Sequence, residues 1–80
     1  MHVAVEMSLY PLTAQFIPPI LDFIGRLRKH PGVDVVTNSM STQVSGDYER
    51  VFDALRAEVR ASLSEPHRAV LVMKVLGGAG

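Results

Sequence analysis

The sequence lacks cysteine and any excess of one charge. Without cysteine, its eighty residues can form neither a disulfide framework nor a thiolate metal site, and the redox compartment is left open. Eight basic residues balance eight acidic ones, which argues against a nucleic-acid-binding protein, because such proteins gather a basic excess on one face. No apolar run approaches the roughly 18 residues that span a bilayer. We therefore expect a cytoplasmic protein without membrane insertion.

Motifs for catalysis and for metal binding are missing as well. The sequence has no G-x-S-x-G, no P-loop and no G-x-G-x-x-G. Its histidines lack metal-ligand spacing, and we expect them to be exposed to solvent. They are His2, His30 and His67. Because Ser8 and Ser41 have no histidine nearby in the sequence to act as a base, nucleophilic catalysis is unsupported. The sequence predicts no enzyme, no metal site and no cofactor.

The short chain predicts a single domain. Eighty residues cannot divide into two independently stable cores, so we expect one domain over residues 1–76 and a flexible glycine-rich tail at 77–80. A chain of this size buries only part of the surface that it exposes when unfolded. A ligand or a partner subunit would therefore add usefully to its stability.

Hydrophobic periodicity predicts six elements in the order strand, helix, strand, strand, helix, strand. Their expected bounds are 2–10, from Ile17 or Pro18 to just before His30, 33–36, 40–45, 48–64 and 68–76. Thr13 and Asp47 are the expected N-caps of the two helices. This order predicts an α+β fold, the ferredoxin-like βαββαβ arrangement. Right-handed crossovers then give a four-stranded antiparallel sheet of order 4-1-3-2 with both helices on one face.

Alternation along the strands divides the sheet into two faces. The side chains expected to face the helices are Val3, Val5, Met7, Leu9, Met40, Thr42 and Val44. The side chains expected on the open face are Ala4, Glu6, Ser8, Tyr10, Ser41, Gln43 and Ser45. Residues 69–73 are apolar in succession, a pattern typical of a strand covered on both faces, although the topology places this strand at an edge. We therefore expect a homodimer or homotetramer in which open faces or edges meet.

The polar side chains of the open face allow two interpretations. They can form a hydrated interface between subunits. They can also line a pocket, in which small side chains leave room, Tyr10 supplies an aromatic wall, and Glu6 and Gln43 fix polarity. The two interpretations are not exclusive.

Three segments carry a resemblance to a known family. These are SLYPLT at 8–13, MSTQVSGDYERVF at 40–52 and the last apolar strand running into glycines. Over nearly the whole chain, the sequence resembles the thiamine-binding YkoF-like family. The resemblance implies a ferredoxin-like module that binds thiamine or its hydroxymethylpyrimidine moiety, serves thiamine uptake or salvage, and has no established catalytic activity. Because this chain holds a single copy, a site shaped by two tandem copies would be completed by a second subunit.

By position, the resemblance implies ligand-binding roles for residues of both motifs. These are Ser8, Tyr10, Ser41, Thr42 and Gln43. Glu6 joins them on chemical grounds, because a carboxylate can pair with a protonated ring nitrogen of an aminopyrimidine and an amide such as that of Gln43 can both donate and accept. Tyr10 can stack on the ring. The alternative function is an assembly module whose open face only mediates oligomerisation.

Overall fold

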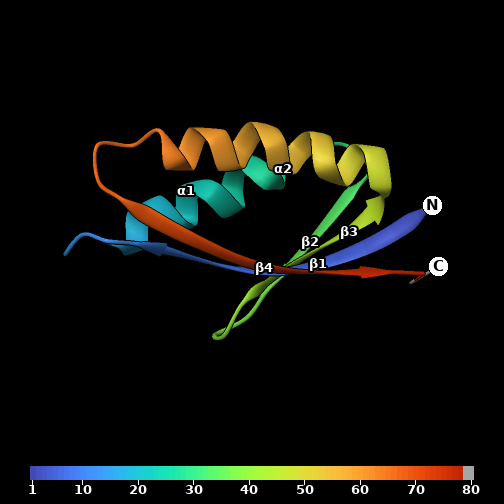
Figure 1. Cartoon of the computed structure of the whole chain (residues 1–80), viewed down its shortest axis with the longest axis horizontal. Coiled ribbons are helices and arrows are strands. Elements are labelled where there is room, and N and C mark those ends of the chain that lie inside the picture. Colours follow the sequence, from blue (N-terminus) through green and yellow to red (C-terminus); the bar gives the residue numbers. More distant parts are fainter. Residues whose placement is uncertain (79–80) are drawn as a thin grey trace.

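The computed structural model describes residues 1–78 and contains the six expected elements in the expected order. They are β1 (His2–Pro11), α1 (Ile17–Leu27), β2 (Val33–Thr37), β3 (Thr42–Asp47), α2 (Tyr48–Leu63) and β4 (Ala69–Gly77). The strands form one antiparallel sheet of order β2-β3-β1-β4, and both helices lie on the same face of it (Figure 1). The predicted ferredoxin-like arrangement and strand order are confirmed. No helix within residues 1–78 is both long and apolar enough to cross a membrane.

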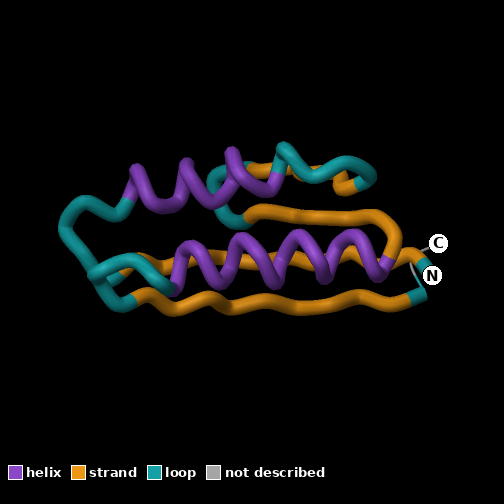
Figure 2. Tube along the Cα trace, turned by 90° about the horizontal axis from the view of Figure 1, so that it is seen from above, coloured by secondary structure: helices purple, strands orange, loops and turns teal. Residues whose placement is uncertain are grey.

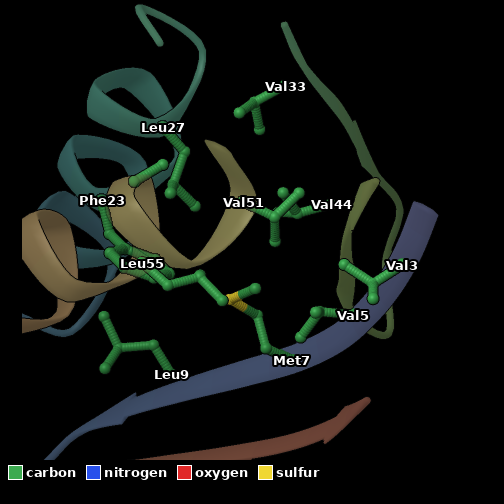
Figure 3. Close-up of a cluster of buried hydrophobic side chains, with 11 residues drawn as sticks. Val3, Val5, Met7, Leu9, Phe23, Leu27, Val33, Val44, Val51 and Leu55 are labelled. Atoms are coloured by element: carbon green, nitrogen blue, oxygen red, sulfur yellow. The ribbon is translucent and has the colours of Figure 1, made fainter. Parts of the chain in front are cut away.

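The core lies between β1 and the two helices. Val3, Val5, Met7 and Leu9 alternate along β1 and point towards the helices, where they meet side chains such as Leu55 (Figure 3). A strand with one buried face stabilises its own register, because a slip of one residue would move every apolar side chain to the open face. Burying a side chain of this size contributes about 1.5–3 kcal/mol. β1 is therefore the strand on which the core is built.

The start of α1 differs from the expectation. Thr13 is not its N-cap: the cap position is Phe16, which has helical backbone angles and no side-chain capping bond. Pro18 and Pro19 occupy the first turn and have no N–H, so few backbone N–H groups remain there to donate to a capping side chain. Of the apolar side chains of α1, only Phe23 and Leu27 are buried. Ile17, Ile20, Leu21 and Ile24 stay partly or largely exposed.

The turn between β2 and β3 also differs from the expectation. Met40 was predicted to lie in a strand and face the helices, but it lies before β3 and is 86 % exposed. Its neighbour Thr42 is buried on the helix side, as its alternation predicted. At the other end of β3, Asp47 is the N-cap of α2: its carboxylate accepts from the N–H of Glu49 at 3.2 Å, which confirms that prediction.

β4 lies at the edge of the sheet and extends to Gly77, one residue beyond the predicted strand. The predicted flexible tail therefore begins with a strand residue, and its last two residues, 79–80, lie outside the described part of the chain. The helices leave this edge strand largely uncovered (Figure 2). Only Ala69 and Leu71 of β4 are even partly buried.

A polar cluster joins the two helices on the outer side of the fold. Glu58 of α2 accepts from Arg26 Nε at 2.8 Å, and its other oxygen lies 2.7 Å from His30 Nε2. Arg26 also donates to the hydroxyl of Ser62 at 2.6 Å. The expectation that His30 is exposed to solvent is wrong, because its side chain is only 30 % exposed and its ring is held against the Glu58 carboxylate, whose side chain is 15 % exposed. The hydrogen bond from His30 is the main cause that lowers the pKa of Glu58; burial opposes it and Arg26 adds to it.

Glu58→Gln is expected to reduce the free energy of unfolding by about 1–3 kcal/mol, because the amide cannot satisfy two charged or hydrogen-bonded partners as a carboxylate does. The pKa of Glu58 is lower in the folded protein than in the unfolded chain. The contribution of Glu58 to the free energy of unfolding is therefore fully present at pH values above the ordinary pKa of glutamate, and it is lost as the pH falls through the lowered pKa. Urea unfolding between pH 3 and pH 7 would measure both effects. Glu65→Gln, at an exposed position, is the control. A Glu58→Gln protein with the same acid dependence as the parent would contradict this account.

Candidate ligand-binding site

β1 is longer than the ladder that joins it to β3. The paired residues run from His2 opposite Asp47 to Met7 opposite Thr42, and there the β1–β3 ladder ends. On its other side, β1 stays paired with β4 as far as Pro11 opposite Ala69. Among the described residues, the segment 8–11 of β1 therefore has β4 as its only strand partner, and the tip of the β2–β3 hairpin diverges from it (Figure 1).

The backbone of β1 alternates between its two neighbours. The carbonyl of Met1 accepts from Tyr48 on the β3 side, and the N–H of Leu12 donates to Arg68 on the β4 side, each at 2.8 Å. In an antiparallel strand the groups of successive residues point to opposite sides, so odd-numbered residues of β1 direct their N–H and C=O towards β3. Leu9 is odd-numbered and lies beyond the end of that ladder. Its N–H and C=O therefore point into the space where the hairpin has diverged.

This space is a hollow of about 460 Å³, which we call the strand-end hollow. Its walls are residues 7–12, Phe16, Ile20 and Ile24 around α1, and residues 37–42 of the hairpin tip. None of these lining residues carries a charge, and most of the wall is apolar. The volume lies within the roughly 300–1,000 Å³ typical of small-molecule pockets. The hollow thus suits a compact, largely neutral ring with a few polar atoms.

The hairpin tip owes its shape to Asn38. Its side-chain Oδ1 accepts from the N–H of Met40 at 2.8 Å and from that of Ser41 at 3.0 Å, and its own N–H donates to the carbonyl of Ser41 at 3.1 Å. Asparagine favours such turns because its short side chain can bond the backbone two residues on. Ser8 of β1 adds a long bond of 3.5 Å to the carbonyl of Met40. These contacts hold the polar wall of the strand-end hollow.

A second hollow of about 560 Å³ lies on the open face of the sheet. We call it the open-face hollow; it is lined by residues 4–6, 36, 43–45 and 74–76. Here Glu6 stands opposite Gln43 on one side and Lys74 on the other, with Lys74 Nζ 4.0 Å from its carboxylate. The two hollows are connected through one contact: Ser41 Oγ donates to Glu6 Oε2 at 3.3 Å.

The structure thus distributes the six sequence-predicted residues over two neighbouring hollows. Four of them, Ser8, Tyr10, Ser41 and Thr42, line the strand-end hollow, and Glu6 and Gln43 line the open-face hollow. Thr42 enters from the helix side, where its hydroxyl lies 3.1 Å from that of Thr37. Ser8 and Tyr10, on the open face of β1, can share one hollow with the helix-facing Thr42 of β3 because the hollow opens at the end of a ladder.

Sequence reasoning missed three contributors to the strand-end hollow. The sequence does not indicate that the N–H and C=O of Leu9 point into the hollow, because this depends on where the β1–β3 ladder ends. Asn38 lies between the expected strands 33–36 and 40–45, and no motif marked it, although it shapes the polar wall. Thr37 was left outside its strand, but it is the last residue of β2 and bonds Thr42. The available sequence signal for this polar wall was the turn-forming pair Asn38-Ser39, which lies between Thr37 and Thr42.

The strand-end hollow offers hydrogen-bonding groups without acid–base partners. Its lining contains no histidine, aspartate or glutamate. Within residues 1–78, no group of three or more His, Cys, Asp or Glu side chains could hold a metal ion. What the arrangement offers chemically is a set of hydrogen-bonding groups beside an apolar wall.

The sequence model of the YKOF-related family matches residues 2–75. Among solved structures, the chain is similar to the hypothetical protein MJ1052 of Methanocaldococcus jannascii, with 26 % identity, a TM-score of 0.80, and coverage of 94 % of this chain and 78 % of that one. It is also similar to protein SP2199 of Streptococcus pneumoniae, with 19 % identity, a TM-score of 0.88, and coverage of 98 % and 88 %. A third similar structure is protein TM0486 of Thermotoga maritima, provisionally assigned to thiamine biosynthesis or salvage. For it the identity is 21 %, the TM-score 0.84, and the coverage 100 % and 87 %. No curated protein matches the chain significantly.

Asn38→Ala is expected to loosen the hairpin tip, because two backbone N–H groups lose their acceptor, each worth about 0.5–1.5 kcal/mol. Amide hydrogen exchange measured by NMR should become faster at Met40 and Ser41 and stay unchanged in the core of β1. Ser39→Ala, in the same turn, is the matched control. Unchanged exchange at both amides would show that Asn38 does not hold the tip.

Proposed function

The chain belongs to the YKOF-related family, and from that premise we propose that it binds thiamine or its hydroxymethylpyrimidine moiety without catalysing a reaction. One observation carries the proposal. Two motifs separated by about thirty residues in the sequence contribute Ser8, Tyr10, Ser41 and Thr42 to one uncharged hollow at the end of the β1–β3 ladder. We place the pyrimidine ring in this strand-end hollow.

The polar groups of the strand-end hollow match the edge of an aminopyrimidine. Such a ring presents an amino donor beside a ring-nitrogen acceptor. Leu9 offers the complementary pair, an N–H and a C=O on one edge of β1, as a neighbouring strand would require. Ser41 adds a directed acceptor: because its hydroxyl proton is donated to Glu6, its oxygen is left to accept from the ligand. Glu6 thus acts on the ligand through Ser41.

The apolar groups of the hollow match the rest of the ring. Tyr10 is 54 % exposed, so one face of its phenol is free to stack on a bound ring. Leu12, Phe16 and Met40 are exposed apolar side chains at the same hollow, and a bound methylpyrimidine would cover them in part. The strand-end hollow has no cationic residue for a diphosphate, and the one cation that lines the open-face hollow, Lys74, already lies 4.0 Å from the carboxylate of Glu6. The unphosphorylated forms are therefore the better ligands.

Glu6 and Gln43 would then serve the part of the ligand that leaves the strand-end hollow. Both line the open-face hollow next to Ser8, and Glu6 carries the negative charge that a thiazolium ring prefers. A ligand of about 10–18 heavy atoms, at roughly 0.3–0.5 kcal/mol per atom, allows dissociation constants from millimolar to micromolar or better. The thiamine assignment of TM0486, a protein of similar fold, supports the same ligand class.

A second candidate function is assembly alone. The open face carries half-exposed apolar side chains on both of its outer strands, which is the composition of a surface that meets another protein surface. They are Val36, Val70, Val72 and Leu76. If this face exists only for oligomerisation, substitutions on it change the assembly and there is no ligand affinity to lose. The two functions are compatible in one homodimer or homotetramer.

Isothermal titration with thiamine and, separately, with hydroxymethylpyrimidine up to millimolar ligand tests the proposal. We expect saturation near one site per chain and weaker binding of thiamine diphosphate. Tyr10→Ala should weaken binding by about tenfold, since an aromatic stacking contact contributes about 0.5–1.5 kcal/mol beyond its buried area. Leu63→Ala, at an exposed position of α2 that lines neither hollow, is the control. A folded protein that gives no heat with either ligand would exclude the binding function.

The same titration separates the two hollows. Thr42→Val keeps the shape of a side chain in the strand-end hollow and removes its hydroxyl, and Gln43→Ala truncates a neighbour in the open-face hollow. If the ring occupies the strand-end hollow, Thr42→Val should weaken binding of hydroxymethylpyrimidine more than Gln43→Ala does. The reverse order would move the ring to the open face.

A further inference from the structure

The hydroxyl groups of the strand-end hollow differ in whether the direction of their hydrogen bonds is fixed. The hydroxyl oxygens of Thr37 and Thr42 lie 3.1 Å apart, and either residue can be the donor. Ser8 makes a long contact of 3.5 Å to the carbonyl of Met40. Hydroxyls such as these can rotate, so each can donate to a ligand or accept from it. They offer hydrogen bonds to a bound ring without selecting its chemistry.

Ser41 is different, because its hydroxyl contacts an ionised group. Its Oγ lies 3.3 Å from Oε2 of Glu6. An ionised carboxylate has no proton to donate, so the proton in this contact comes from Ser41. A hydrogen bond to a charged acceptor is about twice as strong as one between neutral groups, and this opposes rotation of the hydroxyl. The lone pairs of Ser41 Oγ are therefore what the hydroxyl presents to a ligand.

The neighbours of this pair hold both of its members. The N–H of Ser41 donates to Asn38 Oδ1 at 3.0 Å, and its carbonyl accepts from the N–H of Asn38 at 3.1 Å. On the other side of the pair, Glu6 Oε1 lies 4.0 Å from Lys74 Nζ. The two carboxylate oxygens thus serve different neighbours, Lys74 on β4 and Ser41 just before β3. The direction of the Ser41 hydroxyl is set before a ligand arrives.

The free edge of Leu9 cannot by itself distinguish an amino group from a carbonyl. A 4-aminopyrimidine presents an amino donor beside a ring-nitrogen acceptor, whereas a 4-oxopyrimidine presents a carbonyl acceptor beside a ring N–H. Leu9 offers one N–H and one C=O. Either ring can satisfy that pair, because turning the ring over reverses the order of its two groups. Discrimination requires a third group of fixed direction.

We propose that Ser41, held by Glu6, makes the strand-end hollow select a pyrimidine with a 4-amino group over the same ring with a 4-oxo group. This inference rests on the proposed binding of a pyrimidine in that hollow. An amino group has two hydrogens: the carbonyl of Leu9 accepts one and Ser41 Oγ accepts the other. Glu6 is then a positioning residue, which acts on the ligand through Ser41.

The oxo ring fits this arrangement in neither orientation. Placed like the amino ring, it sets its carbonyl oxygen against the lone pairs of Ser41, unless the hydroxyl rotates and gives up its bond to Glu6. Turned over, it restores the pair at Leu9 but presents no N–H to Ser41. Each orientation therefore costs a hydrogen bond that the amino ring makes.

Titration calorimetry with hydroxymethylpyrimidine and its 4-oxo analogue, at a pH where neither ligand is charged, tests this selectivity. The parent should bind the amino form about tenfold more tightly. Glu6→Gln supplies an amide that can donate to Ser41 and so free the hydroxyl proton for a carbonyl. The preference should fall about fivefold or more. Glu65→Gln, which removes the same charge at an exposed position outside both hollows, should keep the parent's preference.

Ser41→Ala separates action through Ser41 from direct action of Glu6 on the ligand. Removing the hydroxyl should lower the preference about as far as Glu6→Gln does, and adding Glu6→Gln to Ser41→Ala should change it no further. Circular dichroism should stay native, because neither side chain is buried. An equal fall on both backgrounds would mean that Glu6 acts on the ligand directly, and it would overturn the proposal.

The parent protein distinguishes failure of this inference from failure of the proposed function. A parent that binds hydroxymethylpyrimidine and its 4-oxo analogue equally well would retain the binding function and overturn the selectivity. A folded parent that binds neither ligand would overturn both.

Discussion

The length of β1 relative to its two neighbours is the constraint on which the rest of the structure depends. β4 pairs with it up to Pro11, whereas β3 leaves it after Met7. This offset gives the strand a fully paired half, which carries the core, and a half-paired end. Because backbone polarity alternates along a strand, the half-paired end has a free edge on one side only, at Leu9. The strand-end hollow is therefore a product of unequal strand lengths, and the core is not opened to form it.

The helix layer also leaves part of the fold uncovered. Two helices cannot cover four twisted strands, and the buried residues gather under the middle of the sheet, around Met7, Phe23 and Leu55. What remains uncovered is the start of α1 at one end and β4 at one edge. The first has an uncharged hollow beside it, and the second has a free row of backbone groups. Each uncovered apolar surface thus lies beside hydrogen-bonding groups, which can fix the orientation of a molecule that contacts it.

The fold was predictable because periodicity, proline and glycine positions and right-handed crossovers all agreed. The site was predictable only in part. Ser8 and Tyr10 could be assigned to a motif, but alternation put them on the open face, whereas the end of a ladder lets them share a hollow with the helix-facing Thr42. Where a ladder ends is decided by hairpin geometry, here by Asn38, which pattern reading does not resolve. His30 was misjudged for a similar reason: its partner Glu58 lies 28 residues away.

The strand-end hollow and the edge strand β4 lie on opposite sides of β1. The lining of the strand-end hollow includes no residue of β4. What β4 provides is support: its residues 69–72 stand opposite residues 8–11 and are, among the described residues, the only strand pairing of this end of β1. Any contact that steadies β4 steadies one wall of the hollow through this ladder, without touching the ligand.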